Sequence, residues 1–164
     1  IYENKFIYPK NLTRVLDSFV AKSDFSMKTG CHYEERVGML NFSIVGRNAT
    51  IEQRHEYATY DAEHGERERI AGNLRKKYPE MDFVIGGAIS IDIFNKGNDK
   101  SQVIPRYFEE ALESNQIHFV GDRIPSPGND FALAEKLRAH KNGYAYEVES
   151  WKDTVELLKT KPFV

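Results

Sequence analysis

Residues 82–94 read DFVIGGAISIDIF and carry the clearest strand pattern in the chain. Isoleucine occupies every second position of the second half of this stretch. Because successive strand residues point to opposite faces, the pattern predicts one apolar face and one polar face, the polar face carrying Ser90 and Asp92. The Gly86-Gly87 pair predicts a bend or bulge within the strand.

The sequence before this strand predicts a mixture of helices and strands. An apolar stripe at helical spacing predicts a helix over residues 11–22, and alternation predicts a strand from 35 to 45. Thr50 and Gln53 have the spacing of a capping box, which predicts the start of a helix. A charged helix is expected over 61–77.

The sequence after this strand alternates more regularly between helical and strand patterns. Short apolar strands in such an alternation indicate a parallel sheet with helices on its faces. A last helix, capped by Ser150 and Asp153, is predicted to bury Val155 and Leu158. The expected elements are a helix over 101–113, a strand over 117–120, a helix over 130–140 and a strand over 143–148.

The pattern of predicted helices and strands changes near residue 95, which predicts two domains and an α/β fold class. Residues 1–95 are expected to form an α+β domain, and residues 96–164 part of an α/β domain. The second domain has only two or three predicted strands. Because these are too few for an independent doubly wound sheet, part of it is expected to be missing.

The amino-acid composition indicates the class of protein and argues against two kinds of partner. Of 164 residues, 40% are hydrophobic and 29% charged, which is typical of a soluble globular protein. The net charge of −2 argues against a nucleic-acid partner. No apolar run approaches the ~20 residues of a membrane helix, so no membrane partner is expected. The single cysteine, Cys31, is expected to be an inert, half-buried thiol in a cytoplasmic protein.

Residues 121–130, GDRIPSPGND, place Asp122 directly after a predicted parallel strand. Ligands bind at the carboxyl ends of such strands, and carboxylates suit Mg²⁺, so Asp122 and Asp130 are candidate metal ligands. The alternative makes Asp130 a helix N-cap and Asp122 a turn residue. Lys100, at another predicted helix start, could neutralise a phosphoryl group or lie in solvent.

A basic set accompanies the polar strand face. Arginine forks match phosphate oxygens, so Arg36, Arg47 and Arg54 are candidate phosphate ligands. Ser90 and Asp92 can bind sugar hydroxyls. In the alternative interpretation, the arginines pair with the abundant glutamates and the strand face is solvated. Together these features suggest a phosphate-bearing sugar held between a basic domain and a metal-bearing domain.

Other cations of the charged helix are expected to lie on its solvated side. They are Arg67, Arg69, Arg75, Lys76 and Lys77.

Four segments in the same order resemble the eukaryotic-type phosphomannomutases of the haloacid dehalogenase superfamily. They are GMLNFSIVGRNATIEQRHEYATYDAEHGERERI at 38–70, IGGAISIDIF at 85–94, GNDK at 97–100 and GDRIPSPGND at 121–130. The resemblance covers residues 33–130 well and the remainder weakly. It implies an α+β cap domain followed by part of a Rossmann-like core with parallel strands.

The resemblance implies a reaction and its ligands. The family transfers phosphate between O1 and O6 of mannose through an aspartyl-phosphate, with Mg²⁺ and a sugar bisphosphate activator. Its cap arginines match Arg36, Arg47 and Arg54, and its sugar contacts match Ser90 and Asp92. The substrate would be a hexose phosphate.

The remaining matched positions belong to the core and to assembly. The catalytic lysine of the family matches Lys100. Its acidic metal loop matches Asp122, with Asn129 and Asp130 closing the loop. The family also dimerises through its cap, which implies a homodimer.

The chain departs from the family at three places. Residues 44–47 read Ile-Val-Gly-Arg where the family has Pro-Ile-Gly-Arg, a change expected to cost little. Residues 131–138 lose the resemblance to a segment that carries a further metal site. The Asp-x-Asp motif of the superfamily, which supplies the nucleophile, is absent from the sequence. The chain is therefore expected to be the C-terminal portion of a larger protein, able to bind but not to turn over.

Two other functions remain open. A sugar-phosphate phosphatase of the same superfamily would share Lys100 and Asp122. A non-catalytic phosphosugar-binding or dimerising module would need no nucleophile.

Overall fold

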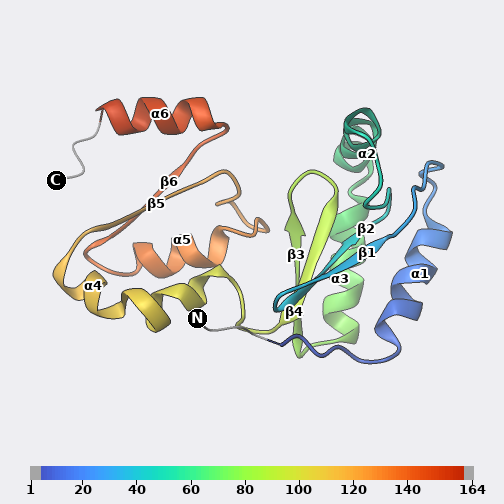
Figure 1. Cartoon of the computed structure of the whole chain (residues 1–164), viewed down its shortest axis with the longest axis horizontal. Coiled ribbons are helices and arrows are strands. Elements are labelled where there is room, and N and C mark those ends of the chain that lie inside the picture. The colour runs from blue at the N-terminus through green and yellow to red at the C-terminus, as the bar shows by residue number, and fades with distance from the viewer. Residues whose placement is uncertain (1–4, 161–164) are drawn as a thin grey trace. The chain divides into compact units, whose positions relative to one another are not determined.

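The computed structural model describes residues 5–160, and the chain divides into two compact units (Figure 1). The first runs from Ile1 to Lys96 and the second from Gly97 to Val164. The first is an antiparallel sheet with helices and the second contains a parallel strand pair, which confirms the α/β class.

The described part of the first unit, residues 5–96, has three helices and four strands. They are α1 (Leu12–Lys22), β1 (Tyr33–Arg36), β2 (Met39–Ser43), α2 (Ile51–His64), α3 (Glu66–Lys77), β3 (Met81–Gly86) and β4 (Ser90–Asn95). The strand order is β1-β2-β4-β3, and each neighbouring pair is antiparallel.

Two predicted single strands are in fact hairpins. The stretch 35–45 was expected to be one strand, but the chain reverses at Val37-Gly38, where Gly38 has a φ of +75°. The stretch 82–94 reverses after Gly86, where a bend within one strand was predicted. In each case the two arms pair with each other, because hydrogen bonding between adjacent arms satisfies their backbone groups.

The helices pack on one face of this sheet. Phe83, Ile93 and Leu40 lie opposite one another on three neighbouring strands and are all buried. Leu16 of α1 and Leu74 of α3 belong to the same core. Burial of such a side chain contributes roughly 1.5–3 kcal/mol. The apolar face predicted for β4 is therefore confirmed.

The capping box at the start of α2 is confirmed. Thr50 Oγ1 accepts from the backbone N–H of Gln53, and Gln53 Oε1 accepts from the N–H of Thr50. Gly65, in the left-handed conformation with φ +61°, separates α2 from α3. Such a φ strains other residues, so the helix predicted over 61–77 is interrupted there.

The second unit is smaller. Its elements are a 3₁₀ turn (Lys100–Gln102), a π-helical turn (Ile104–Phe108), α4 (Glu109–Ser114), β5 (Ile117–Gly121), α5 (Phe131–Arg138), β6 (Gly143–Glu147) and α6 (Trp151–Thr160). Strands β5 and β6 pair in parallel, as the sequence predicted. Ile104, Leu112, Leu133 and Leu137 form the buried core.

One burial prediction in this unit was wrong. No residue of α6 is buried, and Val155 and Leu158 are 39% and 58% exposed. The amphipathic pattern shows which face of a helix could be covered, but it does not show whether a covering surface exists. Among the described residues, no helix has the length and apolar content to cross a bilayer.

Candidate functional site

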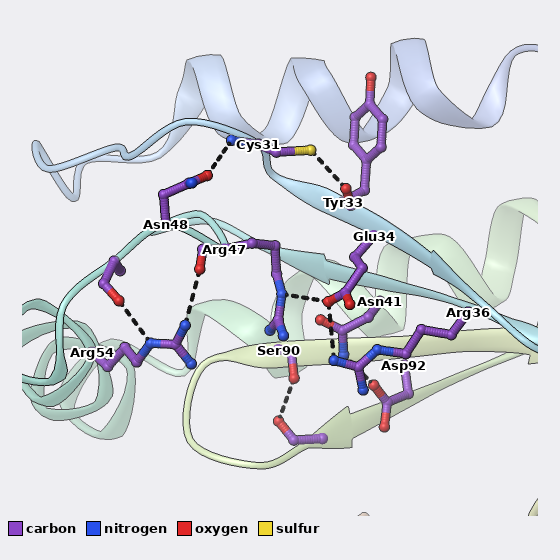
Figure 2. A network of polar contacts seen from close by, with 12 residues as sticks. Cys31, Tyr33, Glu34, Arg36, Asn41, Arg47, Asn48, Arg54, Ser90 and Asp92 are labelled. Atoms are coloured by element: carbon purple, nitrogen blue, oxygen red, sulfur yellow. Dashed lines mark hydrogen bonds and ion pairs between the residues drawn. The ribbon is translucent and has the colours of Figure 1, made fainter.

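The sheet face opposite the helices carries a row of polar side chains. Glu34 lies opposite Asn41, and Asn41 lies opposite Asp92, so the three residues share this face. Ser90 also lies on this face, opposite Ser43 of β2. The predicted polar face of β4 is therefore part of a wider polar sheet face formed by three strands (Figure 2).

Hydrogen bonds orient the two β4 residues. Asn41 Nδ2 donates to Asp92 Oδ1 at 2.6 Å, and Ser90 Oγ donates to the carbonyl oxygen of Gly86 at 2.8 Å. A Cβ on Gly86 would lie 2.5 Å from Asp92 Oδ2. Since real Cβ atoms do not approach so closely, glycine at 86 is what leaves room for this carboxylate.

Two of the predicted arginines converge on one carboxylate. Arg36 reaches Glu34 Oε2 at 3.0 Å and Arg47 reaches the same oxygen at 2.9 Å (Figure 2). The hydrogen bond from Arg36, followed by the charges of Arg36 and Arg47, holds the pKa of Glu34 below its ordinary value. Two guanidinium groups directed at one oxygen form a site suited to an anion.

The third arginine, Arg54 of α2, supports the segment between β2 and α2. Its Nε donates to the carbonyl of Ala49 at 2.9 Å, and a terminal nitrogen donates to the carbonyl of Arg47 at 3.0 Å. Arg54 therefore holds the backbone at Arg47, and the capping box fixes the helical turn from which it projects. The structure thus connects all three predicted arginines through short contacts.

Arg67 is the important residue that sequence reasoning missed. It was assigned to a solvated helix face, but it is buried and pairs with Asp61 at 2.7 Å. It also donates to the carbonyl oxygens of Gly87 and Ser90 at 3.1 and 3.3 Å, which holds the β3–β4 turn. A signal was present, because Arg67 stands three and seven positions before the buried residues of α3 at 70 and 74.

The other cations of α3 fall into two groups. Arg69, Lys76 and Lys77 are exposed, as predicted. Arg75 instead donates twice to the carbonyl of Phe83, at 2.7 and 3.0 Å. The expectation for Cys31 was also wrong in part, because this thiol is exposed and donates to the carbonyl of Tyr33.

Two of the site residues predicted in the second unit, Lys100 and Asp130, are in contact. Lys100 Nζ lies 2.5 Å from Asp130 Oδ1, and the backbone N–H of Arg123 donates to Asp130 Oδ2. Asp130 is only 3% exposed, whereas the Lys100 side chain is half exposed. Asp130 precedes α5 but makes no side-chain cap hydrogen bond, so its carboxylate serves Lys100 and the loop instead of the helix.

An open pocket of about 390 Å³ lies at the carboxyl ends of β5 and β6. Lys100, Asp122 and Asp130 line it together with Ser150 and Trp151. The position agrees with the rule that parallel sheets bind ligands beyond the carboxyl ends of their strands.

The pocket offers a small set of donor groups to a divalent cation. Within residues 5–160, no group of three or more His, Cys, Asp or Glu side chains could hold a metal ion. Mg²⁺ usually takes only one or two protein carboxylates and completes its shell with water and phosphate. The exposed Asp122 and the buried Asp130 fit this smaller demand, and Asn129 is half-buried beside Asp130.

The described residues define a class of protein with an antiparallel α+β unit and a parallel βαβ unit. Comparison with known proteins specifies the family within this class. The pattern of the eukaryotic phosphomannomutase family matches residues 6–162, and the chain belongs to this family.

Curated relatives support this assignment. A phosphomannomutase of Dendrobium officinale is 38% identical over 152 residues, which cover 92% of this chain and 57% of the relative. One of Oryza sativa subsp. indica is 39% identical over 144 residues, covering 87% of this chain and 55% of the relative. One of Saccharomyces cerevisiae is 34% identical over 142 residues, covering 85% and 54%. The chain thus spans about half the length of the curated relatives it matches.

Proposed function

We propose that the intact protein is a phosphomannomutase that interconverts mannose 6-phosphate and mannose 1-phosphate, and that the first unit binds the hexose phosphate. One observation carries the proposal: Arg36 and Arg47 converge on a single carboxylate oxygen of Glu34. This oxygen is negative and accepts two charge-assisted hydrogen bonds, as a phosphate oxygen would. Asp92 lies on the same sheet face, two strands away from Glu34.

Each residue of this face has a role in the proposed complex. The phosphate that does not react takes the place of the Glu34 carboxylate between the Arg36 and Arg47 guanidinium groups. Asp92 accepts from a sugar hydroxyl, and Ser90 binds a second hydroxyl. Arg54 holds the Arg47 backbone, so its contribution to phosphate binding includes positioning.

The reaction also needs the second unit. A mutase that passes through a sugar bisphosphate must bind either phosphate at the cap, while the other phosphate reacts at the core. Lys100 neutralises the transferring phosphoryl group, and Asp122, with Asn129 and Asp130, would hold Mg²⁺. When bound, this cation would neutralise charge on the reacting phosphate.

The nucleophile is proposed to lie outside these 164 residues. An aspartyl-phosphate mechanism requires an aspartate that attacks phosphorus, and no Asp-x-Asp motif occurs in the sequence. The chain alone is therefore proposed to bind substrate without turnover. A cytoplasmic location and a homodimer formed through the first unit belong to the same proposal.

The test is the product formed by the intact protein from mannose 1-phosphate, with Mg²⁺ and a hexose bisphosphate added. The proposal expects mannose 6-phosphate, and an Arg47→Ala variant should lose most of this product. Free phosphate with no isomerised sugar would instead establish the phosphatase. Binding without either product would establish the non-catalytic module.

A further inference from the structure

Two buried polar atoms of β2 have no hydrogen-bond partner among the described residues. They are Asn41 Oδ1 and Ser43 Oγ, in side chains that are 3% and 1% exposed. Native proteins pair nearly all such atoms, since leaving one unpaired costs about 1–3 kcal/mol. Asn41 and Ser43 are two positions apart on one strand, so both face the polar side of the sheet.

Both residues adjoin the proposed sugar-binding pair. Asn41 lies directly opposite Asp92, and Ser43 lies directly opposite Ser90. The two unpaired atoms thus belong to a four-residue patch in the middle of the sheet, with Glu34 next along the row.

The orientation of the Asn41 amide follows from its neighbour. Asp92 Oδ1 is an acceptor at 2.6 Å, so the amide must present its nitrogen to Asp92. The opposite orientation would place two acceptor oxygens against each other. The amide oxygen is thereby directed away from Asp92 with its acceptor capacity unused.

We propose that Asn41 positions the Asp92 carboxylate and that Asn41 and Ser43 together bind a hydroxyl of the ligand, determining which sugar the site accepts. Asn41 Oδ1 accepts a hydrogen bond from that hydroxyl, and Ser43 Oγ donates a hydrogen bond to its oxygen. The inference rests on the proposed function, because it requires a hydroxyl-bearing ligand on this sheet face.

The experiment is calorimetry on the 164-residue chain with mannose 1-phosphate and its monodeoxy analogues. Asn41→Ala should weaken binding of mannose 1-phosphate at least tenfold, because it removes both the support of Asp92 and one ligand contact. Ser43→Ala, which removes a single oxygen, should weaken binding about threefold to tenfold, the range of one hydrogen bond. Asn73→Ala, an exposed asparagine of α3, is the matched control and should change nothing.

The analogues separate a ligand contact from a structural role. For one monodeoxy analogue, the affinity should already be reduced in the wild-type chain and should fall no further with Ser43→Ala. If Ser43→Ala lowered the affinity for every analogue by the same factor, the proposed contact between Ser43 and the ligand would be overturned. Asn41→Asp keeps the side-chain volume but sets two carboxylates against each other, so it should bind as weakly as Asn41→Ala.

The outcomes distinguish this inference from the proposed function. Wild-type affinity in the Asn41 and Ser43 variants, with binding by the unaltered chain, would overturn the inference alone. Absence of binding by the unaltered chain would overturn the proposed binding site and the inference with it. Far-UV circular dichroism identifies any variant that fails to fold, and the nearly isosteric Ser43→Ala then decides the question.

Discussion

Glu34 is the residue around which the arginines of the polar face are arranged. Its carboxylate accepts from both Arg36 and Arg47 and so holds the position proposed for a phosphate. A ligand must displace this carboxylate before it can use both guanidinium groups. In the proposed complex, Glu34 would therefore compete with the ligand phosphate for the two guanidinium groups.

Replacing Glu34 should strengthen binding. Glu34→Gln removes the competing charge, and we expect mannose 1-phosphate to bind the 164-residue chain about threefold to tenfold more tightly. Calorimetry measures this change. Glu63→Gln makes the same charge change at an exposed position of α2 and should leave affinity unaltered. Weaker binding by Glu34→Gln would show that Glu34 assists the ligand.

The competition should also depend on pH in a defined direction. Arg36 and Arg47 lower the pKa of Glu34 from its ordinary value of 4.5, so its carboxylate contact persists above that value and is lost as the pH falls through the lowered pKa. The ratio of wild-type to Glu34→Gln dissociation constants should therefore be nearly the same at about pH 7 and about pH 4.5, where a carboxyl without this shift would be half protonated. Phosphate protonation affects both proteins equally and cancels. A ratio that has moved about halfway toward one by about pH 4.5 would contradict the lowered pKa.

For single residues, the sequence predicted the residue types that bear charge, and one of its two interpretations paired the arginines with glutamates, but it did not identify Glu34 as the glutamate. Ser90 and Asp92 followed from a period of two, because strand geometry alone decides which face a residue occupies. Glu34 and Asn41 could not be found in this way. Their importance depends on register with other strands, which the local sequence does not encode.

The α3 helix and the β3–β4 hairpin are joined by Arg67. Its guanidinium lies between the Asp61 carboxylate and the carbonyl oxygens of the turn. The two charged side chains are about one tenth exposed, so neither is stabilised by bulk water. This contact sets the position of Ser90 at the start of β4.

Removing the buried cation should destabilise the first unit. Arg67→Met removes the guanidinium from Asp61, which keeps only the hydrogen bond from the backbone N–H of residue 67, and we expect a loss of about 3–5 kcal/mol in the free energy of unfolding. Urea denaturation followed by far-UV circular dichroism measures it. Arg69→Met, on the exposed side of the same helix, should change stability by less than about 0.5 kcal/mol. Combining Arg67→Met with Asp61→Asn should recover part of the loss, and no recovery would argue against an uncompensated carboxylate as its cause.

Elements were predicted well where their own residues determine them. The capping box fixed the start of α2, and the alternation after residue 100 correctly indicated parallel strands. Elements were predicted poorly where a chain reversal or a packing partner determines the structure. The two hairpins depend on tight turns, and burial of Val155 depends on a covering surface that no pattern within α6 can supply.

The whole molecule divides its proposed chemistry between two units. The first carries the arginines and the sheet face proposed to bind hydroxyls, and the second carries Lys100 and the aspartates. The family assignment rests on a match to residues 6–162, which includes nearly all of both units. Because the relatives are about twice as long as the matched region, catalysis by the whole protein remains the proposal, while ligand binding can be tested on this chain.

The most direct test is a nuclear magnetic resonance titration of the 164-residue chain with mannose 1-phosphate. The account predicts that backbone amide shifts cluster at Arg36, Arg47, Arg54, Ser90 and Asp92, and that Arg47→Ala abolishes them. Galactose without phosphate should cause no such shifts. Shifts confined to residues 97–164, or no shifts at millimolar ligand, would contradict the assignment of the phosphosugar site to the sheet of the first unit.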